Sequence, residues 1–364
     1  MVARALGPTD RGLLAIVLVL FAVLPTVVSF GGPALFRALA AAGSSPSDAY
    51  RRLRHHSWVG LAVSATMAVL LAHAMPLSST AERWSVAALL AIAALVSYRN
   101  AVLSASIALG RVDLVTRNSF VQGISTLAII SGLFALDALT VTSVCLAYAS
   151  VAIITFAISS RPLVWKESES APVFRLKYAL SSIPGQFGEL MLMRVDQLIA
   201  PAILGLAAGG IYSVGWSYAF MLYPLAHTIA LGKVSGHIED RLRGAWVTPT
   251  LIATVAAIMA AVAFPVIHIL FGDQYAASVP VALVLVVSFA LFGLSTLYVQ
   301  RNLSRGKAYR NSVSALFGIA TILVLSVPLS THNEVGIAWA SVSGAVAGMI
   351  ALIIFERFDD RRRV

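Results

Sequence analysis

Long apolar runs, separated by short polar segments, make up almost all of the 364 residues. A bilayer core about 30 Å thick is crossed by a helix of about 20 apolar residues. The runs therefore predict an all-α, polytopic membrane protein in which no loop is long enough to fold separately. We expect about eleven transmembrane helices, near residues 12–34, 57–75, 84–108, 114–136, 138–160, 178–204, 210–232, 247–270, 280–300, 311–329 and 335–356.

The basic residues indicate how these helices are oriented. Short cytoplasmic loops collect Lys and Arg, and twenty of the 26 Lys and Arg residues fall on one side when the spans alternate. That side includes the C-terminus. We therefore expect a multi-pass protein of the cytoplasmic membrane with its C-terminus in the cytoplasm. The net charge of +10 then reflects topology and contact with anionic lipid headgroups, which argues against a nucleic-acid partner.

The composition agrees with a membrane protein and offers little for metal chemistry. Hydrophobic residues form 59% of the chain and charged residues 12%, against roughly 45–50% and about 25% in soluble proteins. Cys145 is the single cysteine, so the chain forms no internal disulfide. His227 and His268 stand alone in apolar runs, without a second histidine at metal-ligand spacing. We expect no metal, no cofactor and no catalytic residue.

Two short internal repeats predict two halves of the same topology. The segment LGPTDRGLLA from Leu6 matches LGLAAGGIYS from Leu204, and GRVDLVTRNS from Gly110 matches GKAYRNS from Gly306. The offsets, 198 and 196, nearly agree, which is typical of transporters built from parallel repeats. We expect an N-terminal lobe over 1–165 with five spans and a C-terminal lobe over 166–364 with six. A full helix precedes Leu204 but not Leu6, so we expect that a first helix is missing.

In their order along the chain, several segments resemble the multidrug/oligosaccharidyl-lipid/polysaccharide exporter superfamily, specifically its polysaccharide flippase branch. They are ARALGPTDRGLLA, RVDQLIAPAILGLAAGGIYSVGWSYAF, LFGDQYAASVPVALVL, RGKAYRNS and NEVGIAWASVSGAVAG. The resemblance implies two lobes around a central cavity and movement of a lipid-linked oligosaccharide across the membrane by alternating access. Its implied partners are that substrate, membrane lipids, and the polysaccharide polymerase or glycosyltransferases of the same pathway.

Charges inside apolar runs are the candidate functional residues. A charge at mid-membrane costs from about 3 to over 10 kcal/mol against lipid, so each should face protein or water. We expect Arg99, Arg194 and Arg37 to bind substrate, because guanidinium groups suit the phosphate oxygens of a lipid diphosphate. Asp196 and Glu189 are candidates for orienting those arginines or for coupling transport to an ion. In one continuous helix, Arg194 and Asp196 would point to opposite faces.

Each charge also has a purely structural alternative. Arg99, Arg194, Asp196 and Glu189 could lock helices together without touching a ligand, and Arg37 could anchor its helix by extending toward the membrane surface. The aromatic residues Tyr212, Trp216, Tyr218 and Tyr223 could stack on sugar rings, but we favour a role as anchors at the membrane interface.

Other functions remain as alternatives to the flippase. A cation-coupled drug or metabolite exporter of the same superfamily would use Asp196 and Glu189 to bind its coupling ion. A truncated, inactive remnant is suggested by the missing first helix. A membrane enzyme is disfavoured, because loops of about 16 residues at most carry no acidic metal-binding cluster.

Overall fold

The computed structural model describes residues 2–41, 43–159, 163, 166, 176–225, 247–304 and 307–361. Within these ranges every regular element is an α-helix or a short 3-10 helix, and none is a strand. The all-α fold predicted from the apolar runs is confirmed. The predicted cytoplasmic residues Arg161, Lys233 and Arg241, together with His227, lie outside the described residues.

The chain divides into two compact units. Unit 1 comprises residues 1–5 and 20–183, and unit 2 comprises residues 6–19 and 184–364. The boundary between 19 and 20 falls inside helix α2 (Pro8–Val28), and the boundary between 183 and 184 falls inside helix α9 (Leu176–Leu192), so these two helices contribute to both units. The predicted lobe boundary, between residues 165 and 166, lies in a stretch that is mostly outside the described residues and stays a prediction.

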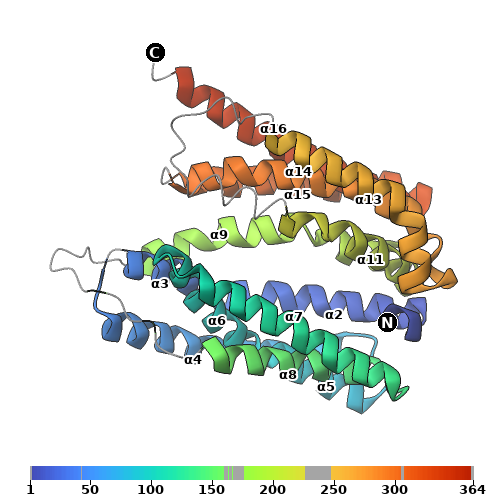
Figure 1. Cartoon of the computed structure of the whole chain (residues 1–364), viewed down its shortest axis with the longest axis horizontal. Helices are drawn as coiled ribbons and strands as arrows, with labels where there is room; N and C mark the ends of the chain where they lie inside the picture. Colours follow the sequence, from blue (N-terminus) through green and yellow to red (C-terminus); the bar gives the residue numbers. More distant parts are fainter. Residues whose placement is uncertain are drawn as a thin grey trace. The chain divides into compact units, whose positions relative to one another are not determined.

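Unit 1 is a bundle in which α6 packs against several neighbours, as the helices labelled in Figure 1 show. Its apolar core joins α3, α4 and α6 through Phe36, Leu53 and Val102. The hydroxyl of Tyr50 accepts a hydrogen bond of 2.7 Å from the backbone N–H of Leu163, which fixes the chain after the last helix. Its helices are α1 (Val2–Ala5), α3 (Gly32–Ala41), α4 (Pro46–Ala74), α5 (Thr80–Ala91), α6 (Ala93–Ala108), α7 (Val112–Ala135) and α8 (Val141–Ser159).

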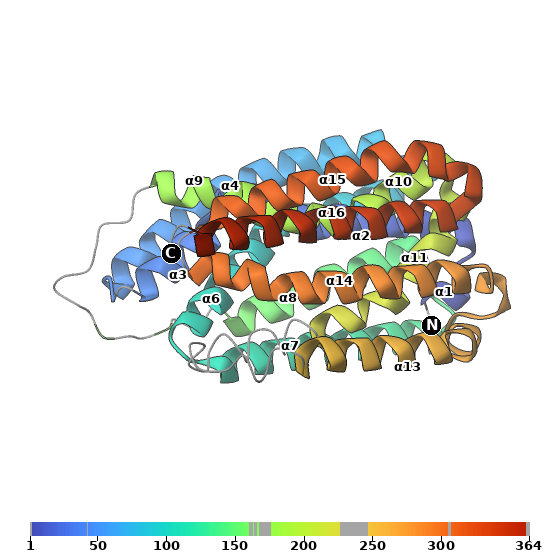
Figure 2. The same ribbon diagram turned by 90° about the horizontal axis from the view of Figure 1, so that it is seen from above.

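Unit 2 is also helical, and its last two long helices pack along their lengths (Figure 2). A third helix, α14, packs on α16 and on α11. Besides the second part of α9 (Leu176–Leu192), the elements are α10 (Val195–Leu204), α11 (Leu206–Phe220), α13 (Val247–Phe271), η3 (Asp273–Tyr275), α14 (Ser278–Ser304), α15 (Ala308–Leu329), η4 (Ser330–His332) and α16 (Asn333–Arg361).

The two segments of the first internal repeat cross each other in unit 2 at two glycines. A Cβ added to Gly12 would lie 1.9 Å from the carbonyl oxygen of Leu206, and one added to Gly210 would lie 1.9 Å from that of Pro8. The offset of 198 relates Pro8 to Leu206 and Gly12 to Gly210, so the contact is reciprocal. Reciprocal contacts are the mark of a local two-fold relation, which supports the internal repeat.

Eight described helical stretches are long and apolar enough to cross a membrane, and the last of them contains both α15 and α16. The predicted number of eleven spans is not confirmed by this count. Large apolar side chains such as Phe120, Ile124 and Leu127 are exposed along one face of α7, as expected of residues that face lipid. The eight stretches are Pro8–Val28, Pro46–Ala74, Thr80–Ala108, Asp113–Ala135, Val141–Ser159, Pro249–Phe271, Ser278–Val299 and Tyr309–Phe358.

Candidate functional site

The helix predicted over 178–204 is broken in the middle, so the expectation of one continuous helix is wrong. Helix α9 ends at Leu192 and α10 begins at Val195, with Arg194 at the N-cap position and φ at −133°. In an α-helix the carbonyl of Met193 would accept from the N–H of Gln197. Here the indole N–H of Trp216 donates to that carbonyl instead, at 3.0 Å.

The carboxylate of Asp196 accepts the backbone N–H that the break leaves without its helical partner. Its Oδ1 accepts the displaced N–H of Gln197 at 2.8 Å, and its Oδ2 accepts the hydroxyl of Tyr212 at 2.6 Å. The hydroxyl of Ser341 also hydrogen-bonds this carboxylate. With only 1% of its surface exposed, Asp196 ties α10 to α11 and α16. This arrangement favours the structural alternative for Asp196.

Arg194 lies at the break, stacked on aromatic rings. Its guanidinium carbon is 4.7 Å from the ring centroid of Trp216 and 5.6 Å from that of Phe220. Both rings are supported by Phe289, which meets them edge-on at 5.3 and 5.5 Å. A cation over an indole face is stabilised by the negative face of the ring. Trp216 and Tyr212 are buried in the protein, which does not suit exposed anchors at the membrane surface.

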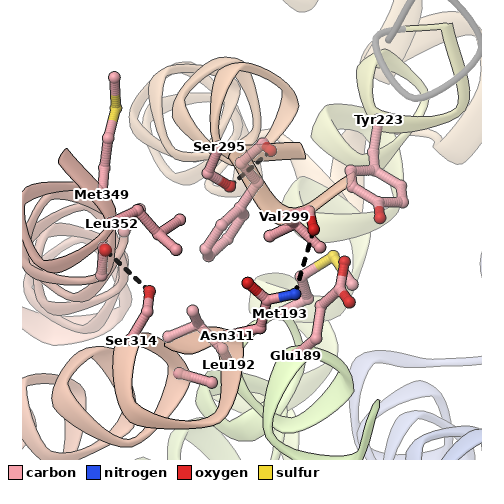
Figure 3. A pocket seen from close by; sticks show the side chains of 14 residues that line it. Glu189, Leu192, Met193, Tyr223, Ser295, Val299, Asn311, Ser314, Met349 and Leu352 are labelled. Atoms are coloured by element: carbon pink, nitrogen blue, oxygen red, sulfur yellow. Dashed lines mark hydrogen bonds between the residues drawn. The ribbon is translucent and has the colours of Figure 1, made fainter. Parts of the chain in front are cut away.

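The carboxylate of Glu189 borders a small cavity within unit 2. The cavity has a volume of about 30 Å³, and Figure 3 shows the side chains around it. Asn311 donates to the carbonyl of Val299 at 3.2 Å and accepts from Asn302 at 2.9 Å. Such a space holds one or two water molecules. Because α9 ends before Asp196, Glu189 and Asp196 lie on two different helices.

Arg99 lies in α6 of unit 1, and its described partners are all neutral. One of its terminal nitrogens donates to the side-chain oxygens of Gln122 at 3.2 Å and Thr155 at 3.1 Å. The other donates to Asn100 at 3.2 Å. These bonds join α6 to α7 and α8. The Nε of Arg99 is buried and makes no hydrogen bond within the described part of the chain.

Neither Arg99 nor Arg194 forms a direct ion pair within the described part of the chain, although the carboxylate of Asp196 lies near enough to Arg194 to attract its charge. Direct ion pairs found among the described residues include Arg51 with Asp48, Arg111 with Asp113, and His268 with Asp273. Both arginines are half-buried. Arg99 belongs to unit 1 and Arg194 to unit 2, and the prediction that they line one shared cavity stays a prediction.

The side chain of Arg37, on α3, is exposed. That position suits the anchoring role that we gave as its alternative, because a long basic side chain at a helix end can extend to the headgroups. Its assignment to the substrate stays a prediction.

A second cavity lies in unit 1 and was not predicted from the sequence. It has a volume of about 280 Å³ and is bordered by Arg111, Arg117 and Asn118. The segment GRVDLVTRNS contains both arginines, but its pattern predicted only half of a repeat. Two arginines beside a glycine at a helix–helix turn were the available signal for a basic pocket.

Comparison with known proteins gives the relationships of the chain. Residues 1–280 match the profile of a family described as polysaccharide biosynthesis protein. No curated protein matches the chain. The fold resembles an inward-facing multidrug resistance MATE family transporter of the MOP superfamily, with TM-score 0.69, 13% identity, and coverage of 99% of this chain and 92% of that one.

Two further solved structures share this fold. Lipid II flippase MurJ, in an inward closed conformation, has a TM-score of 0.66 and 14% identity, with 98% of this chain and 86% of that one covered. A MOP superfamily transporter from Pyrococcus furiosus has a TM-score of 0.67 and 12% identity, covering 97% and 87%. These structures are described as a flippase and transporters, not as enzymes.

Proposed function

We propose that this chain, which belongs to the polysaccharide biosynthesis protein family within the polysaccharide flippase branch of the exporter superfamily, moves a lipid-linked oligosaccharide across the membrane. It is a multi-pass membrane protein with the fold of that superfamily's transporters. The substrate would enter from the cytoplasmic side with its sugar and phosphate groups in the protein and its hydrocarbon tail in lipid. Rocking of two helical bundles would then expose the headgroup on the other side.

The observation that carries the proposal is the pair of half-buried arginines whose hydrogen-bonding and stacking partners among the described residues are neutral, while Asp196, the acid that attracts Arg194, already accepts hydrogen bonds from Tyr212 and Ser341. Arg99 is held by three neutral side chains, and Arg194 lies against Trp216 and Phe220. A cation in a membrane span is costly unless an anion or water faces it. A lipid diphosphate supplies that anion, and guanidinium groups bind phosphate oxygens through paired, charge-assisted hydrogen bonds.

Likeness to a lipid II flippase adds support. That protein is described as a flippase of lipid II, and the stacked rings of Trp216 and Phe220 would suit a headgroup that carries sugar rings. We propose the same class of cargo for this chain, with the glycan itself unspecified.

The test is accumulation of lipid-linked oligosaccharide in a strain that lacks this gene. Arg99→Ala and Arg194→Ala should each reduce export at least tenfold, because each removes a phosphate ligand worth about 1.4 kcal/mol or more. Arg83→Ala, at an exposed position on α5, is the matched control and should restore export fully. Normal export by both variants, at equal protein levels in the membrane, would sink the proposal.

A second candidate function is cation-coupled export of a soluble metabolite or drug. The cavity beside Glu189 favours it, because a space of about 30 Å³ next to a carboxylate can hold a proton-carrying water or a monovalent cation. Efflux of organic cations that depends on an ion gradient, and is lost in Glu189→Gln, would favour this function. Gradient-dependent flipping of lipid-linked sugar, lost in the same variant, would instead assign Glu189 to coupling in the flippase.

We further propose that the C-terminus faces the cytoplasm and that the protein resides in the cytoplasmic membrane. The distribution of Lys and Arg supports both statements. A reporter fused after Val364 that is active only in the cytoplasm tests the orientation.

The polysaccharide polymerase or glycosyltransferases of the same pathway are the proposed neighbours in the membrane, and cross-linking in intact cells would detect them.

A further inference from the structure

A cavity of unit 1 lies where α6 turns into α7. Its volume is about 280 Å³, close to the lower end of the range for ligand pockets, roughly 300–1,000 Å³. The turn is tight because Gly110 adopts φ of +70°, and the N–H of Arg111 donates back to the carbonyl of Ser106 at 2.8 Å. The cavity is lined by Val102, Leu103, Ser106, Arg111, Leu114, Arg117, Asn118, Ile158, Ser159 and Leu163.

The charged residues of the described lining are both basic. They are Arg111 and Arg117, and no acidic side chain is among the lining residues that the structure describes. Arg111 approaches Asp113 through Nε at 3.3 Å, but both side chains are more than half exposed, so the pair contributes little. Arg117 is exposed and has no ion pair among the described residues. An anion would satisfy both guanidinium groups.

A rigid polar wall faces these arginines. Asn118 is only 2% exposed, and its amide nitrogen donates to the carbonyl of Thr155 at 3.2 Å and to the hydroxyl of Ser159 at 2.5 Å. These bonds fix α7 against α8. The site is therefore shaped before any ligand arrives, which lowers the entropy lost on binding.

The remaining lining is apolar and lies at the ends of membrane-spanning helices. Five of the ten residues are hydrophobic: Val102, Leu103, Leu114, Ile158 and Leu163. A free inorganic anion would leave this half of the lining without a suitable partner. A phosphate ester attached to a hydrocarbon matches both halves, and basic pockets between membrane helices bind anionic lipid headgroups.

We propose that this cavity binds the phosphate headgroup of an anionic membrane lipid, with Arg111 and Arg117 as its ligands. The lipid is a resident of unit 1 and is not the transported cargo, whose proposed ligands are Arg99 and Arg194. The proposal rests on the membrane location of the chain and not on its transport activity.

The experiment measures thermal unfolding of the purified full chain in neutral detergent during titration with phosphatidylglycerol. Phosphatidylcholine is the uncharged-lipid arm, and inorganic phosphate is the soluble-anion arm. The double variant R111Q/R117Q should need at least tenfold more phosphatidylglycerol for half of the stabilisation. The matched control R51Q/R357Q also removes two exposed positive charges, and should keep the wild-type midpoint.

A second variant keeps the test informative if R111Q/R117Q does not fold. Asp113→Asn removes the acid beside Arg111 and should lower the phosphatidylglycerol midpoint about twofold or more. Equal losses in R111Q/R117Q and R51Q/R357Q would overturn the site in favour of general surface attraction. Stabilisation by inorganic phosphate without any by phosphatidylglycerol would overturn the lipid assignment, and an unchanged midpoint in D113N and R111Q/R117Q together would overturn the proposal entirely.

Discussion

Two Arg-Asn-Ser triplets, residues 117–119 in α7 and 310–312 in α15, show how differently the two units use one short sequence. In both triplets the asparagine is buried and hydrogen-bonds a neighbouring helix: Asn118 bonds α8, and Asn311 bonds α14. The arginines differ. Arg117 is exposed beside the cavity of unit 1, whereas Arg310 is only 6% exposed.

The surroundings explain the difference. Arg310 lies 5.5 Å from the ring centroid of Phe355 and 5.8 Å from that of Tyr309, and it donates to the carbonyl of Phe355 at 3.2 Å. The cavity of unit 2 is therefore bordered by a carboxylate and no arginine, while that of unit 1 is bordered by two arginines and no carboxylate. The charge of the unit 1 cavity comes from two arginines of the repeated segment, whereas that of the unit 2 cavity comes from Glu189, which lies outside the repeat.

The other repeat, from Leu6 and Leu204, behaves in the opposite way, because its two copies make the same contacts. Gly12 and Gly210 make equivalent contacts, each against the carbonyl of the residue four positions before its partner. No larger side chain fits at either position, so packing keeps this pair alike. The triplets diverge because their arginines meet different neighbours.

The largest expected effect concerns this glycine pair. Gly12→Ala and Gly210→Ala should each lower the free energy of unfolding by about 3 kcal/mol, because the added methyl group overlaps a backbone oxygen. Thermal unfolding in detergent measures the loss. Gly132→Ala is the control, since nothing lies within 4 Å of its position, and its effect should stay within about 0.5 kcal/mol. A loss confined to one of the two glycines would break the equivalence.

A smaller effect separates the two cavities. Asn311→Asp should destabilise the protein by about 2 kcal/mol more than Asn118→Asp, because it adds a second carboxylate to the cavity of Glu189. At Asn118 the new carboxylate would face Arg111 and Arg117, which offset part of the lost hydrogen bonding. Chemical or thermal unfolding of both variants at pH 7 tests this order. Equal losses would mean that the opposite charges of the cavities have no energetic consequence.

The smallest expected effect distinguishes the two arginines. Arg310→Met should lower stability by about 1–2 kcal/mol through the lost hydrogen bond and stacking on Phe355. Arg117→Met, at an exposed position, should change it by less than about 0.5 kcal/mol in lipid-free detergent. The comparison is sharpened by adding phosphatidylglycerol, which should stabilise Arg310→Met but stabilise Arg117→Met less. Arg117→Met as damaging as Arg310→Met would contradict the contrast between the triplets.

Hydropathy alone predicted the helical membrane fold and the approximate position of most long helices, because long apolar runs have few other stable conformations. The break after Leu192 could not be predicted in this way. It depends on Trp216 donating to Met193 across 23 positions of sequence, and no local pattern encodes such a contact. The charges of Arg99 and Arg194 were visible in the sequence, but their neutral and aromatic neighbours were not.

Two helices belong to both units: α2 has residues 8–19 in unit 2 and 20–28 in unit 1, and α9 has residues 176–183 in unit 1 and 184–192 in unit 2. Each of them carries an internal proline, Pro25 in α2 and Pro184 in α9. A proline removes one hydrogen bond of the helix and makes bending easier. Any movement of one bundle in the proposed transport would therefore bend both helices, and these two prolines are the positions where bending meets the least resistance.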